Sequence, residues 1–175
     1  MKEFWEVWLE NKKKLELDLI KYLKLNKIRI ESEVKELVNG HLEKADHNLK
    51  FVKFTLESEE FKDWAIISIY YSIYHASLAL CALKRFSTKD HSATLLILIR
   101  EFYKKGLGKD EIELINKSTI DKEYVIYYVE SRKQRSKASY STMVEFNKDE
   151  VESLRLKAIS FVNKAKEIIE GSSET

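Results

Sequence analysis

The stretch WAIISIYYSIYHASLALCAL, residues 64–83, decides the fold, because it is the longest run of the chain without Asp, Glu, Lys or Arg. Charged residues make up 34% of the sequence, so a run this apolar must be enclosed by the rest of the protein or by lipid. Ser68, Ser72 and His75 recur at helical spacing and line one face of the predicted helix. We interpret that face as a close-packed, hydrogen-bonded seam against a neighbouring helix.

The same stretch is long enough to cross a bilayer. However, it carries three Ser, three Tyr and one His, and the chain has no second stretch of this kind. An apolar helix with these polar side chains, inside a highly charged chain, is typical of the centre of a bundle. We therefore expect a buried central helix and no membrane contact.

The composition predicts an all-α protein, since 175 residues include no Pro and only four Gly, and strand-rich folds need frequent turn residues. The single cysteine, Cys81, excludes an intrachain disulfide and a cysteine-based zinc cluster, and it fits a reducing compartment. The N-terminal residues lack the apolar core of a signal peptide, so we expect a cytoplasmic protein. The net charge of +2 does not by itself indicate nucleic-acid binding.

Apolar residues spaced three and four apart predict an up-and-down bundle of about five to six helices. The expected helices cover residues 3–25, 33–57, 58–85, 91–105, 109–137 and 147–170, and the fifth is either continuous or broken near 117–121. Gly106 is expected to end the fourth of them. The segment NKIRI at 26–30 is too short an alternation to predict a strand, so we interpret it as a connector. We divide the chain into an N-terminal helical extension at 1–30, the bundle at 31–170 and a disordered tail at 171–175.

Two segments carry candidate binding residues. Four of the seven residues in SRKQRSK, 131–137, are basic, and tyrosines flank the segment, among them Tyr140. Arginine can grip phosphate with two hydrogen bonds and tyrosine can stack on a base, although a basic helix end with solvated side chains explains the spacing equally simply. The second segment is the polar break FSTKDHSAT at 86–94, where Lys89 and His91 are expected to be exposed. No P-loop, nucleophile elbow or HExxH motif is present, and we expect neither a metal nor a cofactor.

The order of three segments resembles the HEPN domain family, small all-α domains of prokaryotes that are associated with nucleotides and RNA. YYSIYHASLAL at 70–80 is similar to a YYxxxHAA-type segment of that family, and KDHSATL at 89–95 is similar to its K-x-H-S segment. ESRKQRSKASYS at 130–141 resembles the R-x-x-A-D-Y signature of one branch, through Arg135, Ala138, Ser139 and Tyr140. The final helix matches the closing helix of the pattern. The resemblance covers residues 33–169.

The resemblance implies a homodimer that pairs through its core helices. In catalytic members, an R-x(4–6)-H motif from both subunits forms a metal-independent ribonuclease site, and the family is often encoded beside a minimal nucleotidyltransferase as toxin and antitoxin. This sequence departs from the pattern, since no His follows Arg135 and Ser139 replaces the acidic residue of the branch. The one formal match to the motif, Arg85 to His91, lies after the central helix, and we interpret it as coincidental.

Three functions follow as hypotheses. The first is an RNA- or nucleotide-binding homodimer, a toxin-like or accessory component of a defence module paired with a minimal nucleotidyltransferase. Its expected binding residues are Arg132, Arg135, Lys137, Lys89 and His91. The second is a metal-independent endoribonuclease with a non-standard site, in which Arg135 positions the phosphate and Tyr140 or His91 transfers protons. The third is a non-catalytic helical module that docks a partner protein.

Overall fold

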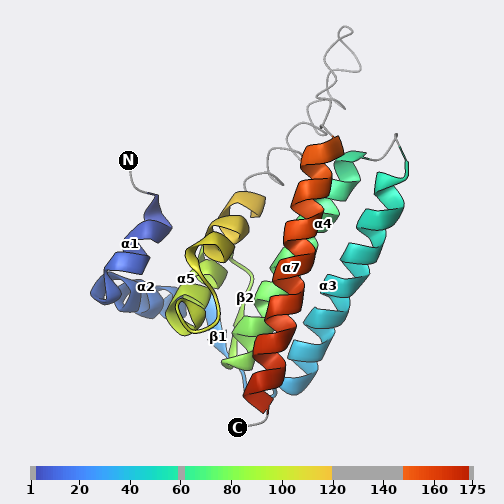
Figure 1. Cartoon of the computed structure of the whole chain (residues 1–175). Coiled ribbons are helices and arrows are strands. Elements are labelled where there is room, and N and C mark those ends of the chain that lie inside the picture. The colour runs from blue at the N-terminus through green and yellow to red at the C-terminus, as the bar shows by residue number, and fades with distance from the viewer. Residues whose placement is uncertain (1–2, 59–61, 120–147, 174–175) are drawn as a thin grey trace, which may run out of the picture.

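The computed structural model describes residues 3–58, 62–119 and 148–173 (Figure 1). Its helices are α1 (Phe4–Glu10), α2 (Lys12–Lys24), α3 (Lys35–Leu56), α4 (Lys62–Leu83), α5 (His91–Phe102), a helical segment at 109–119 and α7 (Lys148–Ser173). The strands β1 (Ile28–Ile30) and β2 (Phe86–Thr88) form one short antiparallel ribbon. The all-α prediction is therefore confirmed, with this ribbon as a small addition.

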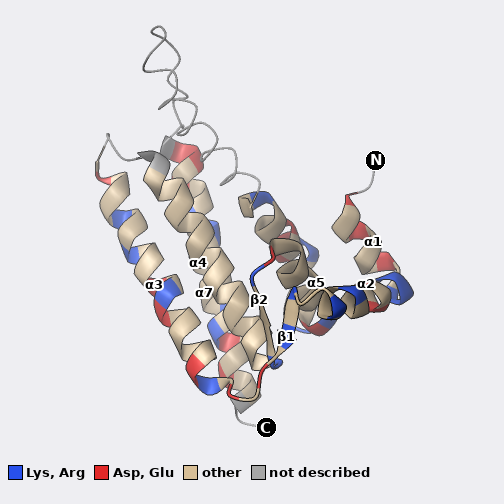
Figure 2. Cartoon of the chain, turned by 180° about the vertical axis from the view of Figure 1, so that it is seen from behind, with Lys and Arg blue, Asp and Glu red and all other residues tan. Residues whose placement is uncertain are grey.

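The apolar stretch is the central helix, as its composition predicts. The long helices α3, α4 and α7 lie side by side, and α5 with the N-terminal helices lies beside them (Figure 1). Figure 2 shows α4 in tan, the colour of uncharged residues, along nearly its whole length, whereas α2 and α3 contain both basic and acidic residues. Ala65, Ala76 and Ala79 of α4 are completely buried, so their small side chains allow neighbouring helices to approach closely.

The length and composition of residues 64–83 also satisfy a simple test for a membrane span. In the structure 72% of the apolar window is buried by the rest of the chain, as in the core helix of a globular domain. Within the described residues no other helix meets this test. The stretch is therefore enclosed by protein, which is the alternative that the sequence favours.

The predicted helix at 3–25 is two helices, because Asn11 ends one and begins the next. The Asn11 side chain accepts a hydrogen bond from the Lys14 amide at 2.9 Å, which satisfies a backbone donor in the first turn of α2. The Trp8 indole donates to Asp18 at 2.9 Å and joins the two helices side by side. Trp5 and Trp8 are buried in the same apolar core as α4 and α5.

The prediction that residues 26–30 form no strand is wrong. Ile28 pairs with Thr88 and Ile30 with Phe86, so the partner strand lies in the polar break more than fifty residues later. A single short strand has no stability of its own, and only the fold brings its partner to it. The ribbon places Lys27, the residue before β1, next to the start of α5.

The fourth predicted helix ends earlier than expected, at Phe102 rather than at Lys105. Gly106 lies in the turn that follows, with a φ of +133° that favours glycine. A Cβ atom at this position would approach the Ile168 side chain to 2.9 Å, so glycine also allows α7 to pack closely here. At the other end of the chain, α7 continues through Gly171 to Ser173, beyond the residue where the tail is predicted to begin.

Candidate functional site

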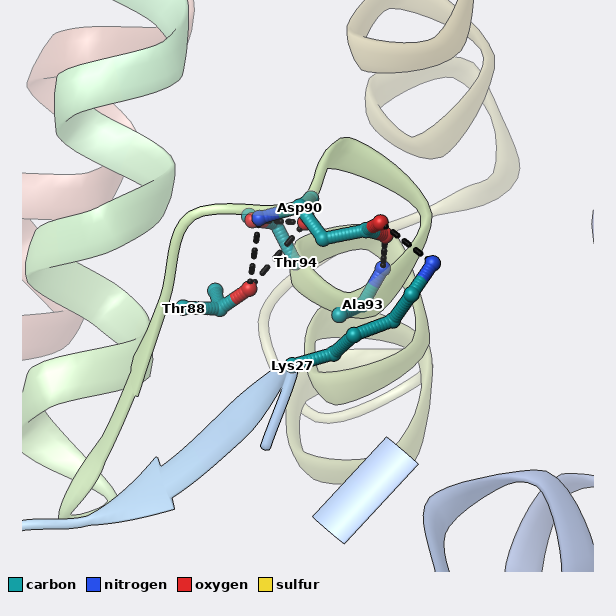
Figure 3. Close-up of polar contacts among 5 residues, drawn as sticks. All are labelled: Lys27, Thr88, Asp90, Ala93 and Thr94. Atoms are coloured by element: carbon teal, nitrogen blue, oxygen red, sulfur yellow. Dashed lines mark hydrogen bonds and ion pairs between the residues drawn. The ribbon is translucent and has the colours of Figure 1, made fainter. Parts of the chain in front are cut away.

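The N-terminus of α5 is fixed by polar contacts that converge on Asp90 (Figure 3). One carboxylate oxygen accepts a hydrogen bond from the Ala93 amide at 2.9 Å, and the Lys27 ammonium lies 2.7 Å from the other. The Thr88 hydroxyl donates to the Asp90 carbonyl at 3.1 Å and accepts from the Asp90 amide at 3.0 Å. Burial raises the pKa of Asp90, but the Lys27 and Ala93 hydrogen bonds outweigh it and hold the pKa below its ordinary value.

His91 is the first residue of α5, and two tyrosines of α4 hold its ring. The Tyr70 hydroxyl oxygen lies 3.0 Å from Nδ1 and 3.1 Å from Nε2 of His91. The Tyr74 ring packs against the imidazole with its centroid 4.7 Å away, and the two tyrosine rings stack on each other. Tyr70 and Tyr74 are four residues apart on one helix, so they present their rings to the same side. The imidazole is therefore oriented by α4 although it belongs to α5.

His91 lines a cleft of about 450 Å³ between three parts of the chain. Glu3 and Phe4 border it from the N-terminal segment, and the segment 109–119 contributes Asn116 and Thr119. Phe4 is 49% exposed, which leaves an aromatic surface at the cleft. The Glu3 carboxylate accepts hydrogen bonds from the Trp5 indole at 2.7 Å and the Asn116 amide at 2.8 Å. The cleft thus combines an imidazole, an aromatic side chain, neutral polar groups and the two carboxylates of Glu3 and Asp90.

Of the two predicted binding residues in the described part of the chain, Lys89 and His91, only His91 lines this cleft. Lys89 is exposed two residues before His91, but it is not among the residues that line the cleft, and it makes no ion pair with the described residues. Arg85 of the formal R-x5-H match donates to the Glu31 carbonyl at 3.1 Å. Five residues, which include the strand β2, separate Arg85 from His91 along the chain. The interpretation of the match as coincidental stays a prediction.

Four predicted site residues lie outside the described part of the chain. They are Arg132, Arg135, Lys137 and Tyr140. Their proposed roles in phosphate binding, stacking and proton transfer therefore stay predictions. Conversely, sequence reasoning missed Tyr70, Phe4 and Asn116 as neighbours of His91. The spacing of Tyr70 and Tyr74 indicates that both rings lie on one face of the helix. The sequence does not indicate which residue that face contacts.

A second histidine cluster lies between α3 and α4. Nδ1 of His41 is 3.2 Å from Nδ1 of His75, and the rings stack with centroids 5.4 Å apart. Burial lowers the pKa of both imidazoles, that of His75 to about 4, with a further contribution from His41. Both are therefore neutral near pH 7. No sequence pattern predicts this pair, because the two histidines are 34 residues apart.

The predicted serine–histidine seam of α4 is only partly correct. The Ser68 and Ser72 hydroxyls donate to carbonyls of their own helix, those of Trp64 and Ile69, at 2.8 and 2.7 Å. Serine in a helix commonly satisfies its hydroxyl in this way, which leaves the helix surface small and apolar. Of Ser68, Ser72 and His75, His75 alone has a polar contact with the neighbouring helix α3 among the described residues, through His41.

No cluster in residues 3–58, 62–119 and 148–173 gathers three or more His, Cys, Asp or Glu side chains that could hold a metal ion. Cys81, the single cysteine, is completely buried, and its thiol points to the Thr94 carbonyl at 3.9 Å. Burial raises its pKa, so the reactive thiolate form is suppressed. A nucleophilic role for this cysteine does not fit its surroundings.

Comparison with known proteins places these features in a family. A family model described as the HEPN domain matches residues 38–169. The chain is 31% identical to the protein named "Putative toxin MJ0142" of Methanocaldococcus jannaschii, over 84% of this chain and 88% of the relative. It is 27% identical to "Putative toxin MJ0605" of the same organism, over 82% of this chain and 96% of that relative. A "UPF0332 protein" of Thermotoga maritima is 26% identical over 79% of this chain and 96% of its own length.

The match of the family model begins within α3 and ends within α7, so it includes the central helix, the ribbon strand β2 and the start of α5 with His91. The resemblance inferred from the three short segments is thereby confirmed. This all-α chain, with its buried helix at 64–83, belongs to the HEPN domain family.

Proposed function

We propose that this protein is the toxin-like member of a prokaryotic toxin–antitoxin or defence pair, and that it binds RNA or a nucleotide at the cleft beside α5. The observation that carries the proposal is the position of His91. Its imidazole borders a cleft of about 450 Å³ at a helix N-terminus, and Tyr70 orients it from a second helix. The similarity to relatives named as toxins supports the toxin-like role.

The charges around the cleft are compatible with an anionic ligand. Its two carboxylates are already engaged, Asp90 by the Lys27 ammonium and Glu3 by two hydrogen-bond donors. The Asp90 carboxylate already caps the N-terminus of α5, so a phosphate there would be held by the His91 imidazole and by Lys89, which is exposed beside the cleft. A base could stack on the exposed ring of Phe4. The ligand class that fits is therefore a nucleotide or a short single-stranded RNA.

Binding of a fluorescent RNA oligonucleotide and of a labelled ATP analogue, measured by anisotropy at two salt concentrations, tests this proposal. We expect His91→Gln and Phe4→Ala each to weaken binding about tenfold, the usual effect of losing one charge-assisted hydrogen bond or one stacking contact. Lys89→Ala should reduce the dependence of log Kd on log salt by about one. Lys50→Ala, which removes an exposed lysine of α3, is the matched control. Affinities that change in none of the variants at His91, Phe4 and Lys89 would refute the proposed site.

Ribonuclease activity is a second candidate, because the Tyr70 hydroxyl lies within hydrogen-bond distance of His91. A histidine whose ring is oriented by a phenol is suited to take or give a proton. Arg135 would position the phosphate, and Tyr140 or His91 would transfer protons. Purified protein is incubated with RNA in the presence of EDTA. Cleavage that His91→Gln and Arg135→Ala both abolish supports this function, and cleavage that survives both variants argues for a contaminating nuclease.

We further propose that the protein forms a homodimer in the cytoplasm. Large apolar side chains on α3 and α4 support this, since Phe51, Phe54, Trp64 and Tyr71 are between 37% and 66% exposed. Light scattering should give twice the chain mass for the parent and one chain mass for Phe54→Glu. The control is Leu156→Glu, which changes a comparably exposed side chain of α7. A monomeric parent would exclude the homodimer.

The proposed protein partner is a minimal nucleotidyltransferase acting as antitoxin. Co-purification with a nucleotidyltransferase encoded next to the gene tests this pairing. Complex formation that an Arg132→Ala/Arg135→Ala double variant leaves unaffected, together with no RNA binding by the parent protein, would favour the third hypothesis, a module that docks a partner without contacting nucleic acid.

A further inference from the structure

The outer face of α2 is not the polar surface that a helix on the outside of a domain usually presents. The inner face carries Leu15 and Leu19, which are buried in the common core, and it packs against α5 and β1. The opposite face exposes Leu17 and Ile20, at 55% and 50%. Two large aliphatic side chains therefore point to solvent from a helix whose inner face is already complete.

The two exposed aliphatic residues stand between lysines along one line of the helix. Residues three or four apart lie on the same side of a helix. This line, the α2 stripe, consists of Lys13, Leu17, Ile20 and Lys24, and all four residues are exposed. At about 1.5 Å of rise per residue, the stripe is about 16 Å long, which is about three helical turns.

The acidic residues of α2 make their contacts inside the molecule. The Glu16 carboxylate accepts a hydrogen bond from Arg100 at 3.0 Å. The Asp18 carboxylate accepts from the Trp8 indole and from the Lys14 ammonium, each at 2.9 Å. Both carboxylates are therefore already paired and do not neutralise the stripe.

The stripe is accordingly basic as well as apolar. Neither Lys13 nor Lys24 forms an ion pair with another residue in 3–58, 62–119 or 148–173. Figures 1 and 2 show α2 at one edge of the molecule, apart from α3 and α7, so its outer face is accessible. A ligand of this face must supply both apolar and acidic groups.

We propose that the α2 stripe is the docking surface for an acidic amphipathic helix of a partner protein. Helices pack by setting apolar residues spaced by three and four against each other, with charged residues at the edges of the contact. Leu17 and Ile20 meet the apolar side chains of the partner helix. Lys13 and Lys24 pair with a Glu or Asp at either end of it.

This surface is separate from the cleft beside α5. None of the four residues of the stripe lines that cleft, and α2 lies outside residues 38–169, which the family model matches. The docking surface therefore does not depend on the proposed function.

Other occupants fit the stripe less well. In a symmetric pair of chains the stripe would face itself and bring lysines against lysines. A nucleic acid would leave the aliphatic side chains without a role, because the stripe contains no aromatic side chain on which a base could stack. Helices that lie on a membrane surface are typically anchored by Trp or Phe, whereas Trp5 and Trp8 of the adjoining α1 are buried.

Fluorescence anisotropy with a designed peptide tests the docking surface. The probe is a labelled helical peptide of about four turns, with Leu at spacings of three and four and Glu beside them. The control peptide has the same composition in scrambled order, so it lacks the apolar face. We expect saturable one-to-one binding of the amphipathic peptide to the full chain, and binding of the scrambled peptide that is weaker by about tenfold or more. This comparison requires no variant of the protein.

Variants of the full chain locate the contact. Leu17→Ser/Ile20→Ser should weaken binding by about tenfold or more at low and at high salt. Lys13→Glu/Lys24→Glu should weaken it at low salt, and a peptide with Lys in place of Glu should restore it. The control is Leu156→Ser, at a side chain of α7 with the same exposure of 55% as Leu17, and its affinity should equal that of the parent. Circular dichroism checks that each variant is folded.

Three results would each overturn the proposal. They are the absence of saturable binding of the amphipathic peptide, an equal affinity for the scrambled peptide, and an affinity that substitution of Leu17 and Ile20 leaves unchanged. Binding only to vesicles of phosphatidylcholine and phosphatidylserine, or only to an RNA oligonucleotide, would assign the stripe to a membrane surface or to nucleic acid instead.

Discussion

Replacement of Asp90 tests how the start of α5, and with it His91, is held. The Asp90 carboxylate makes two separate contacts, a hydrogen bond from the Ala93 amide at 2.9 Å and an ion pair with Lys27 at 2.7 Å (Figure 3). Loss of an N-cap side chain costs about 0.5–2 kcal/mol. The ion pair is partly exposed on both sides, at 41% and 28%, so it contributes only about 0–1 kcal/mol. We therefore expect Asp90→Ala to lower the free energy of unfolding by about 0.5–3 kcal/mol.

Two further variants separate the contribution of the helix cap from that of the ion pair. Asp90→Asn keeps a side-chain oxygen that can accept from the Ala93 amide, so it should cost no more than about 1 kcal/mol. Lys27→Met removes the same ion pair from the other side and should cost a similar amount. Urea unfolding followed by circular dichroism measures all three. If Asp90→Asn is as destabilising as Asp90→Ala, the cap is not the main contribution and the reasoning is wrong.

The Asp90 carboxylate also determines whether the free energy of unfolding rises or falls with pH. The pKa of Asp90 is below its unfolded value of 3.8, so its charge stabilises the folded state fully above that pH. The contribution is lost as the pH falls through the folded-state pKa. The difference in stability between the parent and Asp90→Asn should therefore be full at neutral pH, begin to decrease as the pH falls towards 3.8, and disappear only below the still lower folded-state pKa. A difference that grows in acid would contradict this assignment.

Three other predictions follow from burial. Phe161→Ala, at a side chain only 1% exposed, should cost about 3–5 kcal/mol in urea unfolding, and a loss under 1 kcal/mol would mean that α7 is not packed as described. Ala76→Leu should cost about 1–3 kcal/mol by overpacking α4, where Ala76→Ser is the small-residue control. Cys81 should react with a thiol reagent only as fast as the protein unfolds, because its thiol is buried and its pKa is raised. A rapid reaction in the native state would show that α4 is accessible.

The sequence alone determined the class of the fold, for local reasons. A run of twenty residues without charge can satisfy its backbone as a helix and must then be enclosed, so residues 64–83 predict a central helix directly. The lack of Pro and the periodic apolar residues predict the remaining long helices in the same way. Helix boundaries were less certain, because the end of a helix depends on single side chains. Asn11 divides the first predicted helix through one hydrogen bond to Lys14, and no periodicity reveals it.

The candidate site was only partly predictable. The K-x-H-S segment indicated Lys89 and His91, and His91 does border a cleft. Its neighbours come from α4, the N-terminal segment and residues 109–119, and such contacts depend on how helices pack. The strand at 28–30 illustrates the same limit, since its partner at 86–88 is supplied by the fold.

The histidines show most clearly what the tertiary structure decided. In the sequence His41 stands near His47, and the spacing of six places the two on different faces of one helix. The antiparallel packing of α3 against α4 instead brings His41 to His75, with 3.2 Å between two ring nitrogens. Periodicity reports which side of a helix a residue occupies, because that is a local property of the backbone. Which residue it meets there depends on the relative placement of two helices, and only the packed core sets that placement.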